Sequence, residues 1–469
     1  MINRLMGALQ TGILLPIYER ERSAGLRRTL RHIEREEHLS AEEIQSRQFA
    51  RLKQLLIHAQ ETTEYYRKRF QAAGFDPHTM RSADELRCVP PLTRDDIRSN
   101  LPNMCSKKYE EKELRVSATG GTTNSPVPFK RDIASLRIKT AVQMRFNAWA
   151  GMNPGDKIYR LWGARVDFAE NPSWRWRLYD QGLLRNLWAP TSLLNEQVLE
   201  SYRVQMNQFR PDVVYAYPTP LFLLCQYLAS SAKQFHRPGT VICTAEALVD
   251  SQRRLIESVM GCKVFEHYGS REFGIIAGEC GAGSMHISPP LAFVEYLPVE
   301  GGDGTGLREM LVTDLTNYGM PLVRYKINDC VESVDRDPAC GCGRSFPKLA
   351  KVAGRTSDVF TLPDGSKVPG VALTNRVLQV CPGLVKMQII QENLREFTIR
   401  YVPSAGEESR SLQELRTNLT KFFPSQVVWT FERVTDIERE RSGKTRFCIS
   451  KVGDAGASSS VSAPQGSVG

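Results

Sequence analysis

The sequence lacks any apolar run of the roughly 20 residues that a membrane-spanning helix requires. Its apolar N-terminal stretch, Leu5–Ile17, is interrupted by glycine and polar residues. No small-residue cleavage site follows, and arginines come next, which argues against a secretory signal. We therefore expect a cytoplasmic protein with no transmembrane segment, whose N-terminal stretch has at most some affinity for a membrane surface.

A disulfide framework is also missing. The 11 cysteines form an odd count and show no repeated spacing, which is typical of proteins from a reducing compartment. The chain of 469 residues, with 41% hydrophobic residues, is long enough for more than one domain with a sizeable core.

The formal net charge is +10, which suits an anionic partner such as a nucleotide, coenzyme A, a nucleic acid or a membrane surface. The basic residues are spread along the chain and mixed with acidic ones. A solvated basic surface is therefore favoured over a nucleic-acid groove, and no nucleic-acid partner is expected.

The pattern of residues 1–353 predicts a helical lead-in followed by a large α/β domain. Ser40 and Glu43 form a capping box before a helical apolar pattern, and 133–149 has the pattern of another helix. From residue 196 to 267 strands and helices alternate, which predicts mainly parallel strands. Ligands of such sheets lie beyond the carboxyl ends of the strands, where 244–246 and 268–272 fall.

The remaining sequence predicts a hinge at 354–358 and a small C-terminal α+β domain at 359–452. Strands are expected at 387–391, 397–401 and 427–434, with a helix at 411–422. Residues 453–469 are rich in Gly, Ala and Ser without apolar periodicity, so we expect a disordered tail.

The stretch from Val116 to Lys130 concentrates glycines, hydroxyl residues and prolines, as loops that bind phosphate do. Gly120 and Gly121 allow backbone N–H groups to approach an anion, and neighbouring hydroxyls can donate further hydrogen bonds. The Gly-Lys-Ser/Thr ending of a Walker loop is absent. A flexible surface loop is the simpler interpretation of this stretch taken alone.

Five stretches in the same order together resemble the motifs of adenylate-forming (acyl-activating) enzymes, in the branch of the phenylacetate–CoA ligases and CapK-type proteins. They are the phosphate loop Thr119–Pro126, Tyr268–Glu272 as Y-G-x-x-E, Arg324–Asp329 as R-Y-x-x-G-D, Gly354–Asp358 as G-R-x-x-D, and Ser442–Lys444 as S-G-K. The resemblance covers nearly the whole chain, and each motif alone is weak.

The resemblance implies ATP as cofactor, with roles for individual residues. Lys444 would reach the α-phosphate and Glu272 would hold Mg²⁺, a cation that prefers oxygen ligands. Tyr268 would stack on adenine, and Asp329 would accept hydrogen bonds from the ribose. The other cofactor-binding residues implied are Thr119, Gly120, Gly121, Thr122, Thr123, Thr244, Ala245, Glu246, Gly269 and Arg355.

Two residues depart from the family pattern, and each assignment has a simpler alternative. Asn124 and Asn328 stand where glycine is usual, and we expect both at positive φ, which asparagine tolerates best after glycine. Glu272 could pair with an arginine, Asp329 could cap a turn, and Lys444 could be a solvated lysine.

Cys280, His286, Cys340 and Cys342 have the soft donor atoms of a tetrahedral Zn²⁺ site. Four protein ligands would leave no open position, so the metal would be structural. The two halves are far apart in sequence, and free buried cysteines are the alternative.

Residues 160–194 are rich in tryptophan and arginine, including Trp162 and Trp188. They suit a stacking surface for bases, although an insertion packed over the core is favoured. With the segment 215–222 and His267, they predict a pocket for an aromatic or apolar acid.

The sequence therefore predicts an AMP-forming ligase that adenylates a carboxylic acid and transfers the acyl group, with coenzyme A as the expected acceptor. One alternative is a CapK-like ligase with an amine or hydroxyl acceptor, in polysaccharide or secondary-metabolite assembly. Another is a non-catalytic nucleotide- or nucleic-acid-binding protein.

Overall fold

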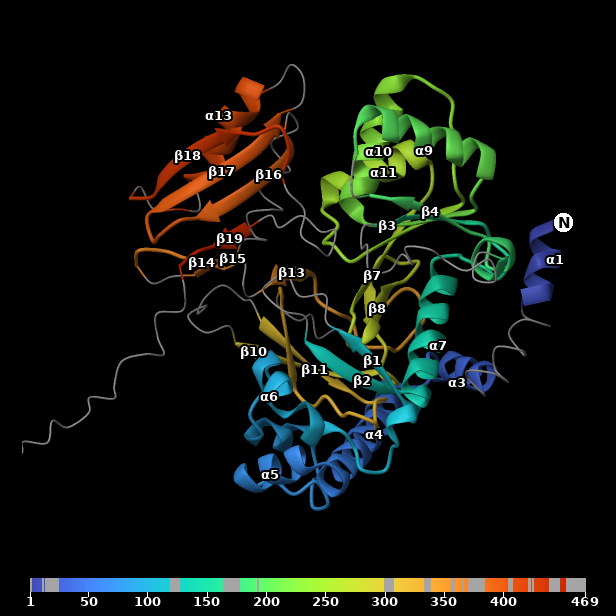
Figure 1. Cartoon of the computed structure of the whole chain (residues 1–469), viewed down its shortest axis with the longest axis vertical. Helices are drawn as coiled ribbons and strands as arrows, with labels where there is room; N and C mark the ends of the chain where they lie inside the picture. Colours follow the sequence, from blue (N-terminus) through green and yellow to red (C-terminus); the bar gives the residue numbers. More distant parts are fainter. Residues whose placement is uncertain are drawn as a thin grey trace, which may run out of the picture. The chain divides into compact units, whose positions relative to one another are not determined.

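The computed structural model divides into two compact units, the first made mainly of residues 1–353 and the second mainly of the residues that follow. Figure 1 draws both units, coloured along the sequence. The residues that the structure describes are 2–10, 12, 25–118, 127–162, 178–191, 194–298, 308–332, 339–355, 359–364, 367–369, 384–403, 408–420, 423, 426–437 and 448–452. The expected tail at 453–469 lies outside them.

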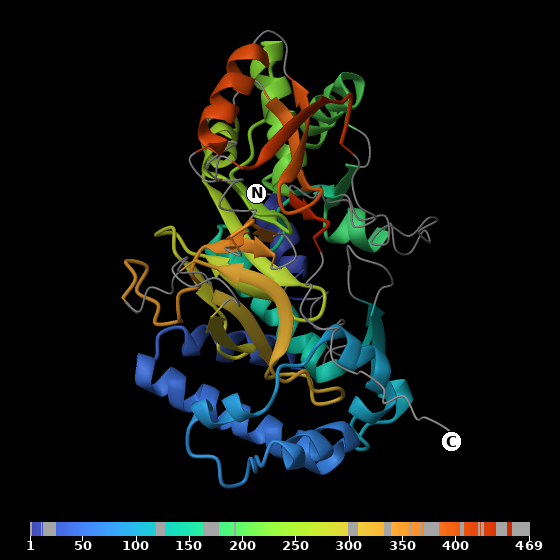
Figure 2. The same cartoon turned by 90° about the vertical axis from the view of Figure 1, so that its left-hand side faces the viewer.

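The first unit begins with the predicted helical lead-in. Its helices are α1 (Ile2–Leu9), α3 (Leu26–Glu36), α4 (Ala41–Thr62), α5 (Glu64–Ala72) and α6 (Arg94–Met104). The capping box of Ser40 and Glu43 begins α4, as predicted. Leu52, Leu56 and Ala59 of α4 recur at helical spacing and are buried. Their core also includes residues of the second sheet of this unit, which is described below. Figure 2 shows the blue helices α4 and α5 along one side of the gold strands.

A seven-stranded sheet is the centre of the α/β domain, in the order β4-β3-β5-β6-β7-β8-β9. Its strands are β3 (Ile158–Trp162), β4 (Asn186–Pro190), β5 (Val213–Ala216), β6 (Thr240–Thr244), β7 (Val264–Ser270), β8 (Gly274–Glu279) and β9 (Met285–Ile287). The strands from β4 to β7 pair in parallel, as predicted, whereas β8 and β9 are antiparallel. The predicted site segments 244–246 and 268–272 begin at the carboxyl ends of the parallel strands β6 and β7, as expected.

Helices cover this sheet because its strands are apolar on both faces. Three helices, α9 (Glu196–Phe209), α10 (Pro218–Ser231) and α11 (Asp250–Met260), share one core with β3, β5, β6 and β7. Alternate residues of these strands, among them Ile158, Tyr215 and Ile242, form a separate cluster. The helix α7 (Ile133–Trp149) has the bounds predicted from the sequence.

A second sheet and a ribbon complete the first unit. The sheet β10-β11-β12-β13 consists of β10 (Ala292–Pro298), β11 (Arg308–Asp314), β12 (Tyr325–Val331) and β13 (Val352–Arg355). The antiparallel ribbon joins β1 (Leu114–Ala118) to β2 (Pro128–Asp132), with Ala118 opposite Pro128. This pairing brings together the two ends of the phosphate loop, whose residues 119–126 lie outside the described part.

The second unit is a small α+β domain, and with the first it confirms the predicted fold class. Its four-stranded sheet has the order β18-β17-β16-β19, and a two-stranded ribbon pairs β14 with β15. The elements are β14 (Val359–Thr361), β15 (Lys367–Pro369), β16 (Leu384–Gln391), β17 (Glu396–Pro403), α13 (Glu408–Leu419), β18 (Val428–Arg433) and β19 (Cys448–Ser450). Phe360, Phe397, Leu415 and Leu419 are central to its core.

Two further expectations can be compared with the fold. The tryptophan-rich stretch is not simply an insertion, because its two ends are strands β3 and β4 of the main sheet; its central residues 163–177 lie outside the described part. Within the described ranges, no helix has both the length and the apolar character needed to cross a membrane.

Candidate active site

The loops that follow β6 and β7 lie side by side, because these strands pair in parallel with Thr244 opposite His267. The Thr244 hydroxyl donates a hydrogen bond to the His267 carbonyl at 2.9 Å, which ties the two strand ends together. Ala245 has φ 74°, an uncommon left-handed conformation for alanine. The backbone N–H of Thr219 donates to the Glu246 carboxylate at 3.1 Å in the first turn of α10, so this side chain caps a helix.

Tyr268 and Asp329 belong to two different motifs, and the fold brings them into contact. The Tyr268 hydroxyl, on β7, donates to Asp329 Oδ2, on β12, at 2.6 Å. Asn328, the residue before Asp329, has φ 62°. The expected positive φ is therefore confirmed at this position, whereas Asn124 lies outside the described residues.

Gly269 follows Tyr268 at a point where two backbones nearly touch. A Cβ at this position would lie 2.1 Å from the Gly274 carbonyl oxygen, so a side chain has no space there. This steric requirement accounts for the glycine without any contact to a nucleotide.

Glu272 is buried and has oxygen atoms suited to Mg²⁺. The hydroxyl of Tyr325 donates to Glu272 Oε1 at 3.3 Å. Burial raises the pKa of Tyr325, so this hydroxyl stays protonated and can donate. Among the described residues no arginine or lysine forms an ion pair with the Glu272 carboxylate. The expected alternative, a pairing with arginine, is therefore absent from this part of the chain, and the carboxylate fits a magnesium ligand.

Other predicted site residues lie outside the described part. They are Thr119, Gly120, Gly121, Thr122 and Thr123 of the phosphate loop, Asp358 of the expected hinge, and Lys444. Arg355 is the last residue of β13.

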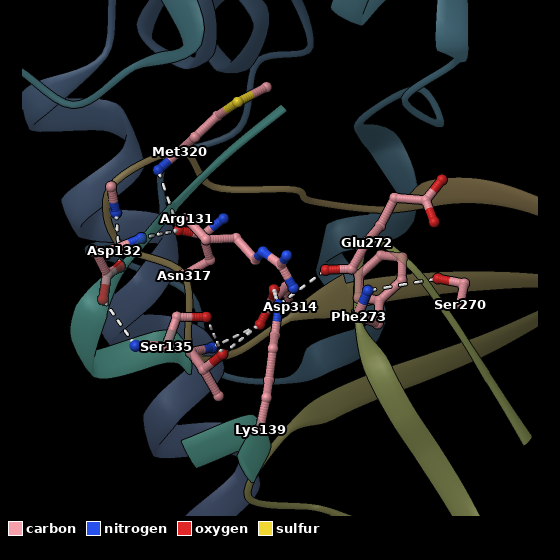
Figure 3. A network of polar contacts seen from close by, with 12 residues as sticks. Arg131, Asp132, Ser135, Lys139, Ser270, Glu272, Phe273, Asp314, Asn317 and Met320 are labelled. Carbon is pink, nitrogen blue, oxygen red and sulfur yellow. Dashed lines mark hydrogen bonds and ion pairs between the residues drawn. The ribbon is translucent and has the colours of Figure 1, made fainter. Parts of the chain in front are cut away.

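A buried ionic contact near Glu272 was not foreseen from the sequence. Lys139, on α7, donates to the Asp314 carboxylate at 2.7 Å and to the backbone carbonyl of Glu272 at 2.8 Å (Figure 3). Desolvation lowers the pKa of Lys139, and the adjacent Asp314 charge opposes this shift. No motif marks Lys139, because a single lysine within a helical pattern is usually solvated.

The four predicted metal ligands come together in one cluster. The donor atoms of Cys280, His286, Cys340 and Cys342 all lie within 4.8 Å of one another. Cys280 Sγ is 3.7 Å from Cys340 Sγ, and Cys342 Sγ is 3.5 Å from His286 Nε2. Usual Zn–S and Zn–N bond lengths with tetrahedral angles require roughly 3.8 Å between two sulfurs and roughly 3.5 Å between sulfur and nitrogen. The donor set therefore fits zinc in type and spacing.

The surroundings of the cluster orient its histidine. His286 Nδ1 is 2.7 Å from the Phe346 carbonyl oxygen, so Nδ1 carries the proton and Nε2 presents its lone pair to the cluster. The pKa values of two thiols in the cluster shift in opposite directions. Burial raises the pKa of Cys280 to about 11, whereas donors from Ser284, Cys342 and His286 outweigh burial and lower that of Cys340 to about 6.

Aromatic residues gather where β3 and β5 end. The Trp162 ring lies 4.6 Å from that of Tyr217 and 6.0 Å from that of Tyr215. The Arg160 guanidinium lies over the rings of Trp188 and Tyr215, at 5.1 and 5.0 Å. The arginine is thus already engaged with protein rings.

Comparisons with known proteins agree with this arrangement. A family model described as the CapK C-terminal domain matches residues 360–451. Protein CapK of Staphylococcus aureus is 25% identical over 367 residues, covering 78% of this chain and 80% of that protein. A phenylacetate–coenzyme A ligase of Escherichia coli strain K12 is 27% identical over 345 residues, covering 69% of this chain and 74% of the ligase.

A solved structure shows the same fold. It is a 2-hydroxyisobutyryl-CoA ligase in the postadenylation state, with a TM-score of 0.68 and 18% identity, and the match covers 89% of this chain and 91% of that chain. Together with the motif order and the two relatives, this likeness confirms the resemblance noted in the sequence. Over most of its length the chain is thus similar to protein CapK and to phenylacetate–coenzyme A ligases, and it has the fold of an adenylate-forming acyl-CoA ligase.

Proposed function

We propose that this AMP-forming ligase activates a small carboxylic acid as its acyl-adenylate and then transfers the acyl group to coenzyme A. The contact between Tyr268 and Asp329, at 2.6 Å, carries the proposal, because it joins the implied adenine and ribose residues of two separate motifs. Relatives named phenylacetate–coenzyme A ligase support the choice of acceptor.

The proposed chemistry requires positioning more than covalent help. The acid carboxylate attacks the α-phosphorus of ATP, a bond to phosphorus forms, and pyrophosphate leaves. Glu272 would hold Mg²⁺, which neutralises charge on the phosphate oxygens. The phosphate loop would donate N–H and hydroxyl groups to the β- and γ-phosphates, and Lys444 would stabilise charge at the α-phosphate.

The second half-reaction breaks the mixed anhydride. The coenzyme A thiol, losing its proton, attacks the acyl carbon, and AMP leaves. We propose that residues 354–358 are the hinge that moves Lys444 away from the reacting centre between these steps.

For the substrate we propose an aromatic or apolar acid. Support comes from the aromatic side chains at the ends of β3 and β5, above all Trp162, Tyr215 and Tyr217. These rings offer apolar surface, and their guanidinium neighbour Arg160 is already held between two rings.

A second candidate is transfer of the acyl group to an amine or hydroxyl. The match of residues 360–451 to the CapK C-terminal domain and the likeness to protein CapK favour it. The two candidates share the adenylation step and differ only in the acceptor.

For the cysteine–histidine cluster we propose one structural Zn²⁺ ion. The 3.7 and 3.5 Å separations between donor atoms support tetrahedral coordination, and four protein ligands leave no position for substrate.

The test of the proposed function is ATP–pyrophosphate exchange across a broad panel of aromatic, aliphatic, hydroxy and sugar acids. We expect exchange with at least one apolar acid, and AMP release on addition of coenzyme A. If an acid supports exchange but its acyl group is transferred to an amine or an alcohol and not to coenzyme A, that result would select the second candidate. If no acid supported exchange, the ligase proposal would fail.

A further inference from the structure

Two successive carbonyl groups of the loop that carries Glu272 face two cations. Lys139 Nζ donates to the Glu272 carbonyl at 2.8 Å, and Arg131 Nη1 makes a longer contact of 3.5 Å to the Arg271 carbonyl. In Figure 3 the Glu272 carbonyl points toward Lys139, whereas its carboxylate points away from it. The cations therefore contact the backbone carbonyls of Arg271 and Glu272, whereas the Glu272 carboxylate accepts from the Tyr325 hydroxyl.

Arg131 is on β2 and Lys139 is on α7, and Asp132 holds the junction of these two elements in place. Asp132 Oδ1 accepts from the Ser135 backbone N–H at 2.7 Å and caps α7. Its Oδ2 accepts from the backbone N–H groups of Tyr318 and Gly319, at 2.9 and 3.0 Å. Lys139 and Arg131 thus start from a backbone that is itself anchored to the turn between β11 and β12.

Burying the charged Lys139 side chain costs free energy, so its buried position calls for an explanation. Its side chain is 6% exposed, and that of its partner Asp314 is fully buried. Asp314 Oδ1 also accepts from the backbone N–H and the hydroxyl of Thr316, at 3.0 and 2.6 Å. Well-packed apolar residues often replace such a pair without loss of stability, so stability alone does not explain its presence.

Arg131 connects the same loop to the phosphate-loop ribbon. Its Nη2 donates to the Ser117 hydroxyl on the facing strand at 2.6 Å, two residues before the phosphate loop begins. Its Nε is buried and has no hydrogen-bond partner in the described part of the chain. Desolvation lowers the pKa of Arg131, while the charges of Asp314 and Glu272 oppose the shift. One side chain thus contacts both the loop that carries Glu272 and the strand that leads into the phosphate loop.

We propose that Lys139 is a positioning residue for Glu272, and that Arg131 holds this loop in register with strand β1, so that the Glu272 carboxylate meets the magnesium ion of MgATP. The proposal rests on the proposed function. Magnesium demands nearly ideal octahedral geometry, so a small displacement of one carboxylate weakens its binding. Groups that orient a metal ligand commonly change metal affinity by roughly 10- to 100-fold when they are altered.

The test is calorimetric titration of the whole protein with ATP, once with excess Mg²⁺ and once with a chelator. Lys139→Met removes the cation and keeps a side chain of similar length. We expect the affinity for ATP with Mg²⁺ to fall about tenfold or more, and the affinity without Mg²⁺ to change less than about twofold.

A double variant guards against misfolding. Lys139→Met alone leaves the Asp314 carboxylate buried without its cation, so Lys139→Met/Asp314→Asn removes both charges together. The matched control is Lys157→Met, since Lys157 Nζ donates to the Phe209 carbonyl at 2.9 Å, far along the chain from the site. We expect the double variant to lose magnesium-dependent affinity and the control to keep it.

The outcomes separate the inference from the function beneath it. Wild-type protein that binds no ATP, with or without Mg²⁺, would contradict the proposed function. Wild-type protein that binds MgATP, together with a folded double variant of equal affinity, would overturn the positioning role. Equal loss with and without Mg²⁺ would overturn it as well, because that pattern indicates a general structural effect.

Discussion

Two buried histidines on the same sheet have opposite surroundings. His286 on β9 and His267 on β7 are 0% and 1% exposed. Both ring nitrogens of His286 have partners, the Phe346 carbonyl and the Cys342 thiol. His267 has a long contact of 3.4 Å from Nδ1 to the Tyr215 hydroxyl, and its Nε2 has no hydrogen-bond partner in the described ranges.

The difference shows that burial alone does not make a histidine a ligand. His286 has one nitrogen oriented by a carbonyl and lies with three thiols in a donor set that spans no more than 4.8 Å, an arrangement that fits a metal ion. His267 lies among the apolar rings of Phe146 and Tyr215, which only disfavour its charged form. Two predictions test this contrast, beginning with the larger expected effect, and a third tests a hydrogen bond of the candidate nucleotide site.

The largest effect is expected at the cysteine–histidine cluster. Purified protein should contain about one zinc ion per chain, and Cys340→Ser should lose most of it. Because binding energy at a structural site is folding energy, thermal stability should fall by several kcal/mol. Metal analysis and thermal unfolding measure the two effects, and adenylation per folded molecule should stay within about twofold.

The matched control is Cys105→Ser, which alters a half-buried thiol outside the cluster. Its zinc content and stability should follow the wild type. Wild-type protein that is folded and active with no bound metal would rule out the zinc site.

The second prediction concerns the pH dependence that His267 imposes. Burial, weakly opposed by the backbone of Phe146, lowers the pKa of His267 from 6.5 to about 4. The unfolded chain binds this proton at higher pH than the folded chain does, so stability is fully present above pH 6.5 and is lost as the pH falls toward 4. His267→Leu should therefore retain about 2 to 3 kcal/mol more of its pH 7.5 stability at pH 4.5 than wild type does.

Denaturant unfolding at several pH values measures this effect. His267→Gln serves as a second variant, because it keeps a polar group but does not titrate. Parallel pH profiles for wild type and both variants would show that His267 gains its proton equally well in the folded protein.

The same contrast explains which features could be predicted from sequence. A local rule placed the capping box of Ser40, whereas the positive φ of Asn328 was expected because the family motif usually has glycine at this position. Cys280 and Cys340 could be assigned to one candidate metal site because thiols are the soft donor atoms that zinc prefers. The family resemblance and the fold class were likewise confirmed, since the ordered motifs extend over most of the chain.

Long-range polar contacts could not be predicted. Lys139 and Asp314 are 175 residues apart, and each belongs to a residue type that is usually solvated. The same holds for Glu37, which accepts from Arg145 and Trp149 of α7 and from Arg344, much further along the chain. Such pairs form only after the sheets and helices have packed, so no local pattern marks them.

The last and smallest prediction tests a partly buried polar contact, between Tyr268 and Asp329. Tyr268→Phe keeps the ring that would stack on adenine and removes only the hydroxyl that donates to Asp329 at 2.6 Å. A hydrogen bond to a charged group contributes about 1.5 to 3 kcal/mol, and partial access of water reduces this to about 1 kcal/mol. We therefore expect the KM for ATP to rise about fivefold, with kcat nearly unchanged, because the freed carboxylate can still bind the ribose.

Tyr159→Phe is the matched control, since it removes a hydroxyl that contacts Gln205 at 3.1 Å in another part of the sheet. Its KM for ATP should equal that of the wild type. A Tyr268→Phe protein with unchanged KM but lowered thermal stability would show that the contact with Asp329 serves the fold and not the nucleotide. A rise in the KM for ATP, with unchanged KM values for the other substrates, would assign the Tyr268 hydroxyl to the nucleotide site. A structural hydroxyl would not affect ATP more than the other substrates.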